Sequence, residues 1–207
     1  MGKEFGEFVG VDSATVALVT EDSDENYTAG PNEFLAPSAE ISAEVSTNTK
    51  TTYYDNVPGF NYNTEGVTTI TVTVSGVPAK TAAKILGKNY DEESGRVLDD
   101  GVLNPPDMAL SFRFNKGPSE YRYYQYMKGN FSGGTEDAES KTDDVNEHTY
   151  ELTYTAVVTT HKWEIDGKNK GLKRIFADTD DENFQQEAAD EWFFAVQTPD
   201  GPTKSGS

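Results

Sequence analysis

The alternation of apolar and polar residues is clearest between residues 66 and 76. Ile70, Val72 and Val74 alternate there with threonines. A period of two, in residue types that suit a pleated and half-buried surface, is typical of a β-strand. Similar alternation or β-rich composition predicts further strands at 8–20, 39–47, 108–114, 121–131 and 148–160.

Turns and loops separate these strands. The strands at 108–114 and 121–131 flank a short turn, so we predict that they form an antiparallel hairpin. Polar connections are expected at 21–37 and 132–147, the second because it is rich in glycine, serine and acids.

A short helix is predicted directly after the central strand. Pro78 suits a first helical turn, because the N–H that it lacks would be unpaired there, and Gly87 suits the end of the helix. Between them, small apolar residues recur at the spacing of one helical face: Ala79, Ala82, Ala83 and Leu86. A helix this short is unstable alone, so we expect it to lie on the sheet with Lys80 and Lys84 pointing outward.

A second helix is predicted from about Thr179 to Val196. The segment 179–182 resembles a capping box with acids in the first turn, and the apolar face would hold Ala189, Trp192, Phe193 and Val196. The order of elements predicts an α+β fold that is mainly β: an antiparallel β-sandwich or open barrel with a flanking helix and a C-terminal helix. We expect one domain over residues 1–200, and a flexible tail at 201–207.

Residues 48–65 differ from their neighbours, because they lack apolar periodicity but hold four aromatic residues. Long aperiodic segments in small domains are usually functional or disordered, and aromatic residues on such a segment favour contact with another molecule. We therefore predict a long hairpin arm. The alternative is a hairpin folded back on its own domain. The candidate contact residues on the arm are Tyr53, Tyr54, Asp55, Asn56, Phe60 and Tyr62.

The chain is strongly acidic, with 36 acids against 17 lysines and arginines and a formal net charge of −19. Such a charge repels nucleic acid phosphates and anionic membranes. It argues against a protein that grips DNA, but not against one that lets DNA slide past. No apolar run approaches the ~20 residues that span a bilayer, so we expect no membrane partner and no secretory signal.

No catalytic or cofactor motif is recognisable, so we expect neither an enzyme nor a cofactor. The chain has no cysteine, which excludes disulfides and thiolate metal sites. His148 and His161 bracket one predicted strand, too far apart to share a metal ion. A partial match to a calcium loop is formed by Asp22, Asp24, Asn26 and Glu33. Tyr27 stands where that loop needs glycine, and we predict no metal site there.

Several segments together resemble the major tail protein, or tail tube protein, of long-tailed bacteriophages, including its phi13-type family. The matching segments are VALVT, AEISAEVSTNTKTTYYDN, TVTVSGVPAKTAAKILG, YRYYQYMKGNFS followed by KTDD, and a C-terminal helix ending EWFFAV. They cover most of residues 8–198 in the order of the family.

The resemblance implies a structural subunit, six copies of which close into a ring whose sheets join around a lumen. Rings would stack through the arm at 48–65, and DNA would leave the capsid through the tube without specific binding. The implied partners are further copies of the chain, a tape measure protein and a tail terminator. The implied location is the virion tail, with assembly in the host cytoplasm.

Charge bears on this assembly in two ways. An acidic lumen would suit a tube that must not bind a sliding polyanion, whereas acids on the outside would serve solubility. The one basic cluster lies at 161–174, and we expect Lys168, Lys170 and Lys173 to pair with the acidic loops 21–25 and 136–147 of a neighbouring subunit. Two other functions stay open: a non-catalytic surface- or carbohydrate-binding module that uses exposed tyrosines, and a tube protein of a contractile injection or secretion system.

Overall fold

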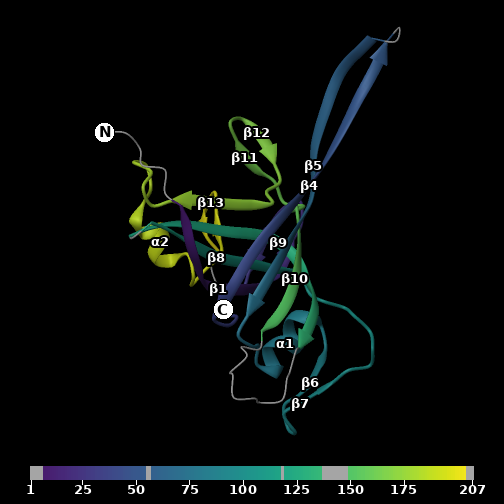
Figure 1. The fold of residues 1–207 in the computed structure, drawn as a ribbon, viewed down its shortest axis with the longest axis vertical. Helices are drawn as coiled ribbons and strands as arrows, with labels where there is room; N and C mark the ends of the chain where they lie inside the picture. The colour runs from purple at the N-terminus through teal and green to yellow at the C-terminus, as the bar shows by residue number, and fades with distance from the viewer. Residues whose placement is uncertain (1–6, 55–56, 118, 137–148, 204–207) are drawn as a thin grey trace, which may run out of the picture.

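The computed structural model describes residues 7–54, 57–117, 119–136 and 149–203, with the backbone alone at 53, 54, 58, 62, 135 and 136. Its main element is a nine-stranded sheet in which every neighbouring pair is antiparallel (Figure 1). The strands are β1 (Phe8–Asp22), β2 (Tyr27–Ala29), β3 (Glu33–Phe34), β4 (Ser38–Tyr54), β5 (Val57–Val74), β8 (Met108–Lys116), β9 (Glu120–Glu136), β10 (Tyr150–Val157) and β13 (Arg174–Asp178).

The smaller elements surround this sheet. Two helices are present in the described residues, α1 (Ala79–Leu86) and α2 (Gln186–Glu191). Three two-stranded hairpins pair β6 (Asn89–Asp91) with β7 (Arg96–Leu98), β11 (Trp163–Ile165) with β12 (Lys168–Lys170), and β14 (Gln197–Thr198) with β15 (Gly201–Pro202). In the described part of the chain, neither helix is long and apolar enough to cross a membrane.

The strand order of the sheet is β2-β1-β8-β9-β10-β5-β4, with β3 added to β1 and β13 added to β9. The predicted β8–β9 hairpin is confirmed, with Phe112 opposite Tyr124. The sheet curves so that β4 approaches β1 without pairing with it in the described residues, which makes an open barrel around the main apolar cluster. The predicted fold class, α+β and mainly β, is therefore confirmed.

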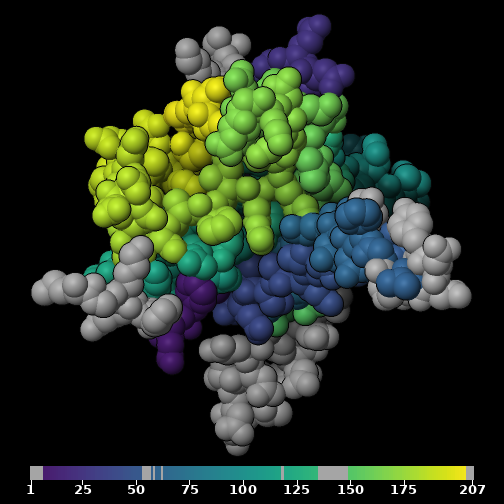
Figure 2. All heavy atoms as spheres, turned by 90° about the horizontal axis from the view of Figure 1, so that it is seen from above, coloured from purple at the N-terminus to yellow at the C-terminus, as the bar shows by residue number. Residues whose placement is uncertain are grey.

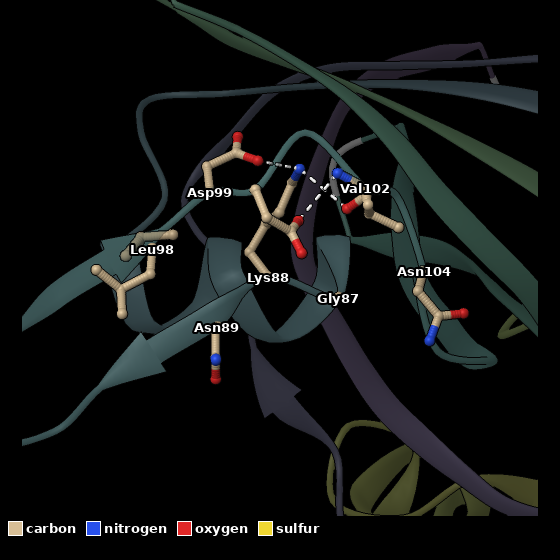
Figure 3. A pocket seen from close by; sticks show the side chains of 9 residues that line it. Gly87, Lys88, Asn89, Leu98, Asp99, Val102 and Asn104 are labelled. Atoms are coloured by element: carbon tan, nitrogen blue, oxygen red, sulfur yellow. Dashed lines mark hydrogen bonds and ion pairs between the residues drawn. The ribbon is translucent and has the colours of Figure 1, made fainter.

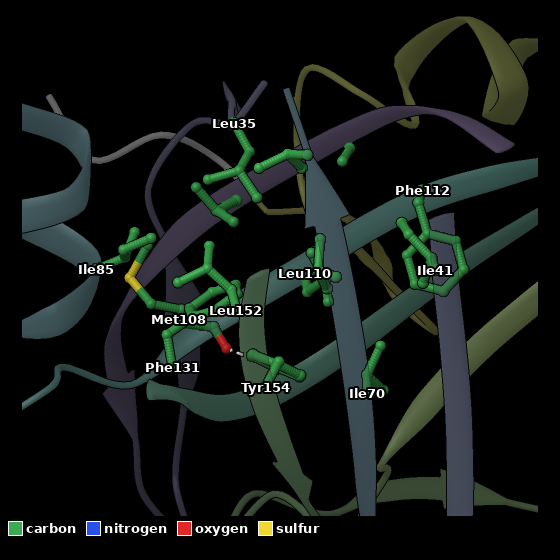
Figure 4. Packing of buried hydrophobic residues seen from close by; sticks show 14 of the residues in the cluster. Leu35, Ile41, Ile70, Ile85, Met108, Leu110, Phe112, Phe131, Leu152 and Tyr154 are labelled. Atoms are coloured by element: carbon green, nitrogen blue, oxygen red, sulfur yellow. Dashed lines mark hydrogen bonds between the residues drawn. The ribbon is translucent and has the colours of Figure 1, made fainter. Parts of the chain in front are cut away.

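The main core lies inside this barrel, where the strand alternation sends its apolar residues (Figure 4). Ile70, Val72 and Val74 are fully buried, as their spacing predicts. In the register of β5 and β10, Leu152 faces Val72 and Tyr154 faces Ile70. The Tyr154 hydroxyl donates a hydrogen bond to the backbone oxygen of Met108 (2.8 Å), so this buried polar group is satisfied.

Helix α1 lies where the sequence predicts it, but its buried face differs in part. Pro78 is the N-cap, and Gly87 ends the helix in the left-handed conformation (φ 67°). The buried residues are in the second half of the helix: Ala83, Ile85 and Leu86. Ala79 is exposed, because only the C-terminal half of α1 packs on the core.

Helix α2 is shorter than predicted, and the capping box at 179–182 is wrong. The Thr179 backbone N–H donates a hydrogen bond to the Tyr121 backbone oxygen (3.0 Å), and the Thr179 hydroxyl accepts one from the Tyr121 N–H (2.9 Å). Thr179 therefore extends the β13–β9 pairing and is unavailable as a helix cap. The predicted apolar face still packs in part, since Ala189, Trp192 and Val196 are buried.

Candidate functional site: the polar sheet face and the arm

Over β4, β5, β10 and the end of β9, the face of the sheet that points away from the main core carries hydroxyl, amide and carboxylate side chains. Over β1, β8 and β9 up to Met127, that face instead packs against a second apolar cluster around Trp163. In β4, β5, β9 and β10 the polar residues alternate with the core residues, so a period of two sends them all to the same side. The strand register aligns them in three rows: Glu40–Thr73–Glu151, Ser42–Thr71–Thr153–Ser132 and Glu44–Thr69–Thr155–Asn130. We call this surface the polar face.

The polar face is acidic and holds no lysine or arginine among the residues of its three rows. Its glutamates, at 40, 44 and 151, are all exposed, and Thr73 separates Glu40 from Glu151. The cation next to the rows is Lys128, which lies opposite Val157. Its ammonium contacts the carboxylates of Asp22 (2.8 Å) and Asp107 (3.3 Å), so its charge is already compensated.

Asp22 forms a buried junction beside this face. Its side chain is 3% exposed and accepts hydrogen bonds from the backbone N–H groups of Thr160 (2.8 Å) and His161 (2.9 Å). Burial alone would raise the pKa of Asp22, but the hydrogen bonds from His161, Lys128 and Thr160 outweigh it and lower that pKa. Asp22 is therefore a structural carboxylate that ties the end of β1 to the segment after β10.

The residues of the partial calcium loop are used separately. Asp22 binds Lys128 and the backbone N–H groups of Thr160 and His161. Glu33 pairs with Lys84 on α1 (2.7 Å). Asn26 donates its amide to Glu21 (3.0 Å). Among the described residues, no group of three or more acids and histidines could hold a metal ion. His148 lies outside the described residues.

The arm is a continuation of β4 and β5 beyond the barrel. Its strands pair from Thr47 opposite Glu65 to Tyr54 opposite Val57, and Figure 1 shows the arm extending away from the body rather than folding back on it. Phe60 is 69% exposed. The sequence pattern does not predict these strands, because polar residues on both faces of the hairpin give no apolar alternation.

The predicted contact residues are spread along the arm. The backbone of Tyr53 and Tyr54 lies at the far end of the paired strands, and that of Tyr62 lies closer to the base, opposite Lys50. Asp55 and Asn56 fall outside the described residues.

A lysine holds the base of the arm. The Lys173 ammonium contacts the Glu65 carboxylate (3.0 Å), the Gly66 backbone oxygen (2.6 Å) and the Thr68 hydroxyl (3.3 Å). The hydrogen bond from Lys173 is the main reason why the pKa of Glu65 is lowered. Seen from the arm end, the arm in blue emerges beside the light green segment at 160–175 (Figure 2).

The three lysines predicted to act together are thus used differently. Lys173 is 10% exposed and engaged within its own chain. Lys168 and Lys170 are exposed on β12, and within the described residues Lys170 makes a distant contact with Asp166 (3.9 Å).

The tyrosines of the β8–β9 hairpin do not form an exposed platform. Tyr123 and Tyr126 are buried, and Tyr124 stacks on Phe112 (ring centroids 5.4 Å apart). A carbohydrate-binding module needs accessible aromatic faces, so this arrangement does not favour that alternative.

A β-hairpin that extends from the body of a protein exposes strand edges that can pair with another chain. A comparison with protein families identifies the class of protein. A model of the phage tail tube protein family matches residues 27–198, and the chain belongs to that family. It is therefore a structural subunit of a tail tube, and a component of the virion tail.

Among solved structures, the chain is similar to one from the cryo-EM structure of the sheath–tube complex of an extracellular contractile injection system, PVC, in its extended state. The identity is 14% and the TM-score 0.44, over 82% of this chain and 90% of that one. No curated protein matches.

Proposed function

We propose that six copies of this subunit close into a ring with the polar face toward a central lumen, and that rings stack through the arm into a tube that conducts DNA. The observation that carries the proposal is the composition of the polar face. Proteins hold DNA phosphates mainly with lysine and arginine. A wall of hydroxyls and glutamates repels a polyanion and offers it no cation.

Closure of the ring is supported by the open edge of the sheet. β4 is the last strand in the order and pairs on one side only, with β5, in the described residues. An unpaired strand edge pairs readily with another strand. A repeated edge-to-edge contact between unlike surfaces closes into a ring when the rotation allows it. The number six comes from the family resemblance.

The same proposal names the partners and the place of assembly. The subunit would bind further copies of itself, a tape measure protein inside the tube and a terminator at its end. DNA would pass without specific binding during ejection. Assembly would take place in the host cytoplasm before the tail joins the virion of a long-tailed phage.

Cysteine labelling tests the orientation of the polar face. The chain has no native cysteine, so a single introduced thiol is the only reactive one. Ser42→Cys places it on the polar face, and Glu187→Cys places it on α2 as a control; both residues are exposed. Light scattering and negative-stain microscopy would first establish whether the purified chain forms rings or tubes.

A maleimide on a large polyethylene glycol should label both variants as free subunits. In assembled tubes it should still label Glu187→Cys but no longer Ser42→Cys, while a small maleimide should label both. Equal labelling of both variants by the large reagent would overturn the lumen assignment. A chain that stays monomeric at every concentration, even with a tail initiator complex, would overturn the whole assembly proposal.

A further inference from the structure

The arm and a surface groove lie at opposite ends of the molecule. In Figure 1 the tip of the arm is at one end of the longest axis, and the β6–β7 hairpin is at the other. β4 and β5 run through both the polar face and the arm. If the polar face lines a lumen, the arm therefore points along the wall toward a neighbouring ring, and the end that it meets there is the β6–β7 end.

The groove at that end is a hollow of about 650 Å³ between the β6–β7 hairpin and the segment 99–104 (Figure 3). Lys88 crosses it, with its ammonium on the Asp99 carboxylate (2.5 Å) and the Val102 backbone oxygen (3.2 Å). Both turns of the segment are fixed, because the Asp99 and Asp100 side chains accept backbone hydrogen bonds from Gly101 and Val102. The groove is thus a formed structure. We call it the end groove.

Two exposed aliphatic residues, Leu98 and Val102, line the end groove among charged and amide side chains. Leu103, next to Val102 in the chain, is also exposed. Val102 is 60% exposed. Such clustered apolar exposure, rimmed by charged residues, is typical of a surface that meets another protein.

The arm offers apolar side chains to this surface and carries little net charge. Its described tip presents two exposed apolar side chains, Val57 and Phe60. Residues 48–65 hold one lysine and two acids, a formal charge of −1 out of the −19 of the chain. The segment 91–100 beside the groove holds five acids and one arginine. A nearly neutral arm that carries Lys50 meets less repulsion there than other, more acidic parts of the chain would.

We propose that the arm of one subunit docks in the end groove of a subunit in the next ring, with Phe60 against the rim formed by Leu98 and Val102. This inference rests on the proposed stacking of rings and adds the surface that receives the arm. The contact joins two different surfaces of identical chains, so it continues without limit along one axis.

A second apolar hollow offers the main rival docking surface. It measures about 470 Å³ and lies beside α2, where Phe176, Phe184 and Trp192 line it. β13 and α2 lie on the flank of the body in Figure 1 and not at the end opposite the arm. An arm that points along the strands of its own subunit would meet the end groove first.

Cross-linking in assembled tubes distinguishes the two surfaces. The double variant Phe60→Cys with Leu98→Cys should give a ladder of covalent multimers with a short bismaleimide, because each subunit then carries both halves of the contact. The double variant Phe60→Cys with Phe176→Cys is the control and should give no ladder. Mass spectrometry of the linked peptides would identify the joined residues.

Charge substitutions give a second readout that needs no cross-link. Val102→Glu should abolish sedimentable tubes while the variant stays folded by circular dichroism, since Val102 is exposed. Phe194→Glu, at an even more exposed position, should polymerise like the wild type.

Failure of the end-groove docking can be told apart from failure of ring stacking. Tubes in which residue 60 links to residue 176, or tubes that form normally with Val102→Glu and give no link at residue 98, would overturn the end-groove docking and leave ring stacking intact. If the wild-type chain forms no tubes under any condition, stacking itself fails, and the docking with it.

Discussion

Lys173 and Glu65 form an ion pair at the point where β5 leaves the barrel and enters the arm. The two residues are 108 positions apart in the chain. Lys173 also donates to Gly66 and Thr68, so one side chain joins the base of the arm and the adjoining residues of β5 to the segment before β13. The base of the arm is therefore held by a contact outside the hairpin itself.

Removing this lysine should loosen the base of the arm. Lys173→Met would leave the Gly66 oxygen and the buried Thr68 hydroxyl without their donor, and should lower the free energy of unfolding by about 1–2 kcal/mol. Lys168→Met is the matched control, because Lys168 is exposed on β12, and should stay within ~0.5 kcal/mol of the wild type. Urea unfolding at pH 7 measures both. Equal losses of unfolding free energy in the two variants would mean that Lys173 contributes only through the net charge of the chain.

The same variant predicts a pH dependence. The pKa of Glu65 is lowered in the folded protein, so its pairing contributes stability above the unfolded pKa of about 4.3 and loses it as the pH falls through the lower folded pKa. The stability gap between the wild type and Lys173→Met should therefore narrow below about pH 4. A stability gap that stays constant from neutral to acid pH would assign the effect to the hydrogen bonds from Lys173 to Gly66 and Thr68 alone.

Asp22 should contribute to acid sensitivity in the same direction. Its pKa is lowered overall, so its contribution is fully present above the unfolded pKa of about 3.9 and is lost as the pH falls through the folded value. Asp22→Asn should lower the free energy of unfolding by about 1–3 kcal/mol at pH 7 and weaken the acid dependence. The exposed Asp24→Asn, in the same turn, is the control. Urea titrations at pH 7 and pH 3 measure the stability of both variants. Equal losses of stability in the two variants would contradict a buried junction at Asp22.

Helix α1 offers a test of its packing face. Ala83 is 2% exposed, so Ala83→Glu would force a carboxylate into the core and should cost about 2–5 kcal/mol. Lys84→Gln, one residue further, removes only the half-exposed ion pair with Glu33 and should cost at most ~1 kcal/mol. Thermal unfolding measures both. A mild effect at Ala83 would mean that α1 moves easily off the barrel.

Assembly should depend on salt. Six copies in a ring would carry 6 × −19 = −114 formal charges, and raising salt from 0.1 to 1 M shortens the Debye length from about 10 to 3 Å. Single exposed pairs are worth only ~0–1 kcal/mol, so relief of the summed repulsion should dominate. We predict that moderate salt promotes polymerisation in sedimentation assays.

A charge variant identifies the bases that matter for assembly. Lys168→Glu with Lys170→Glu should raise the salt needed for polymerisation, because both lysines are exposed and free to meet a neighbour's acids. Lys80→Glu with Lys84→Glu makes the same charge change on α1 and should raise it less. If assembly of the wild type falls steadily as salt rises, attractive pairs dominate and this interpretation of the charge is wrong.

The sequence predicts the elements that have one buried face. Val72 and Leu152 belong to strands that the sequence predicts, because a period of two separates core residues from solvent-facing residues on each strand. Gly87 marks the end of α1 because few other residues adopt its backbone conformation. The family resemblance supplied the function, which composition and spacing left open.

The remaining features depend on register and on distant partners. The polar face appears only when β9, β10, β5 and β4 are aligned, since each strand alone shows just its threonines and glutamates. The role of Lys173 requires knowing that Glu65 lies beside it. The capping-box prediction failed at Thr179 because its hydroxyl and backbone already bind Tyr121, a partner 58 residues away.

The unbroken run of β4 and β5 from the barrel into the arm has a mechanical consequence. Their pairing shifts register in places but continues along both, so an arm gripped by another molecule transmits torque directly into the barrel wall. Bending the arm at its base would strain the Lys173 contact. A stack of such subunits would resist twisting as one elastic rod, and each ring would inherit its rotational position from the ring before it.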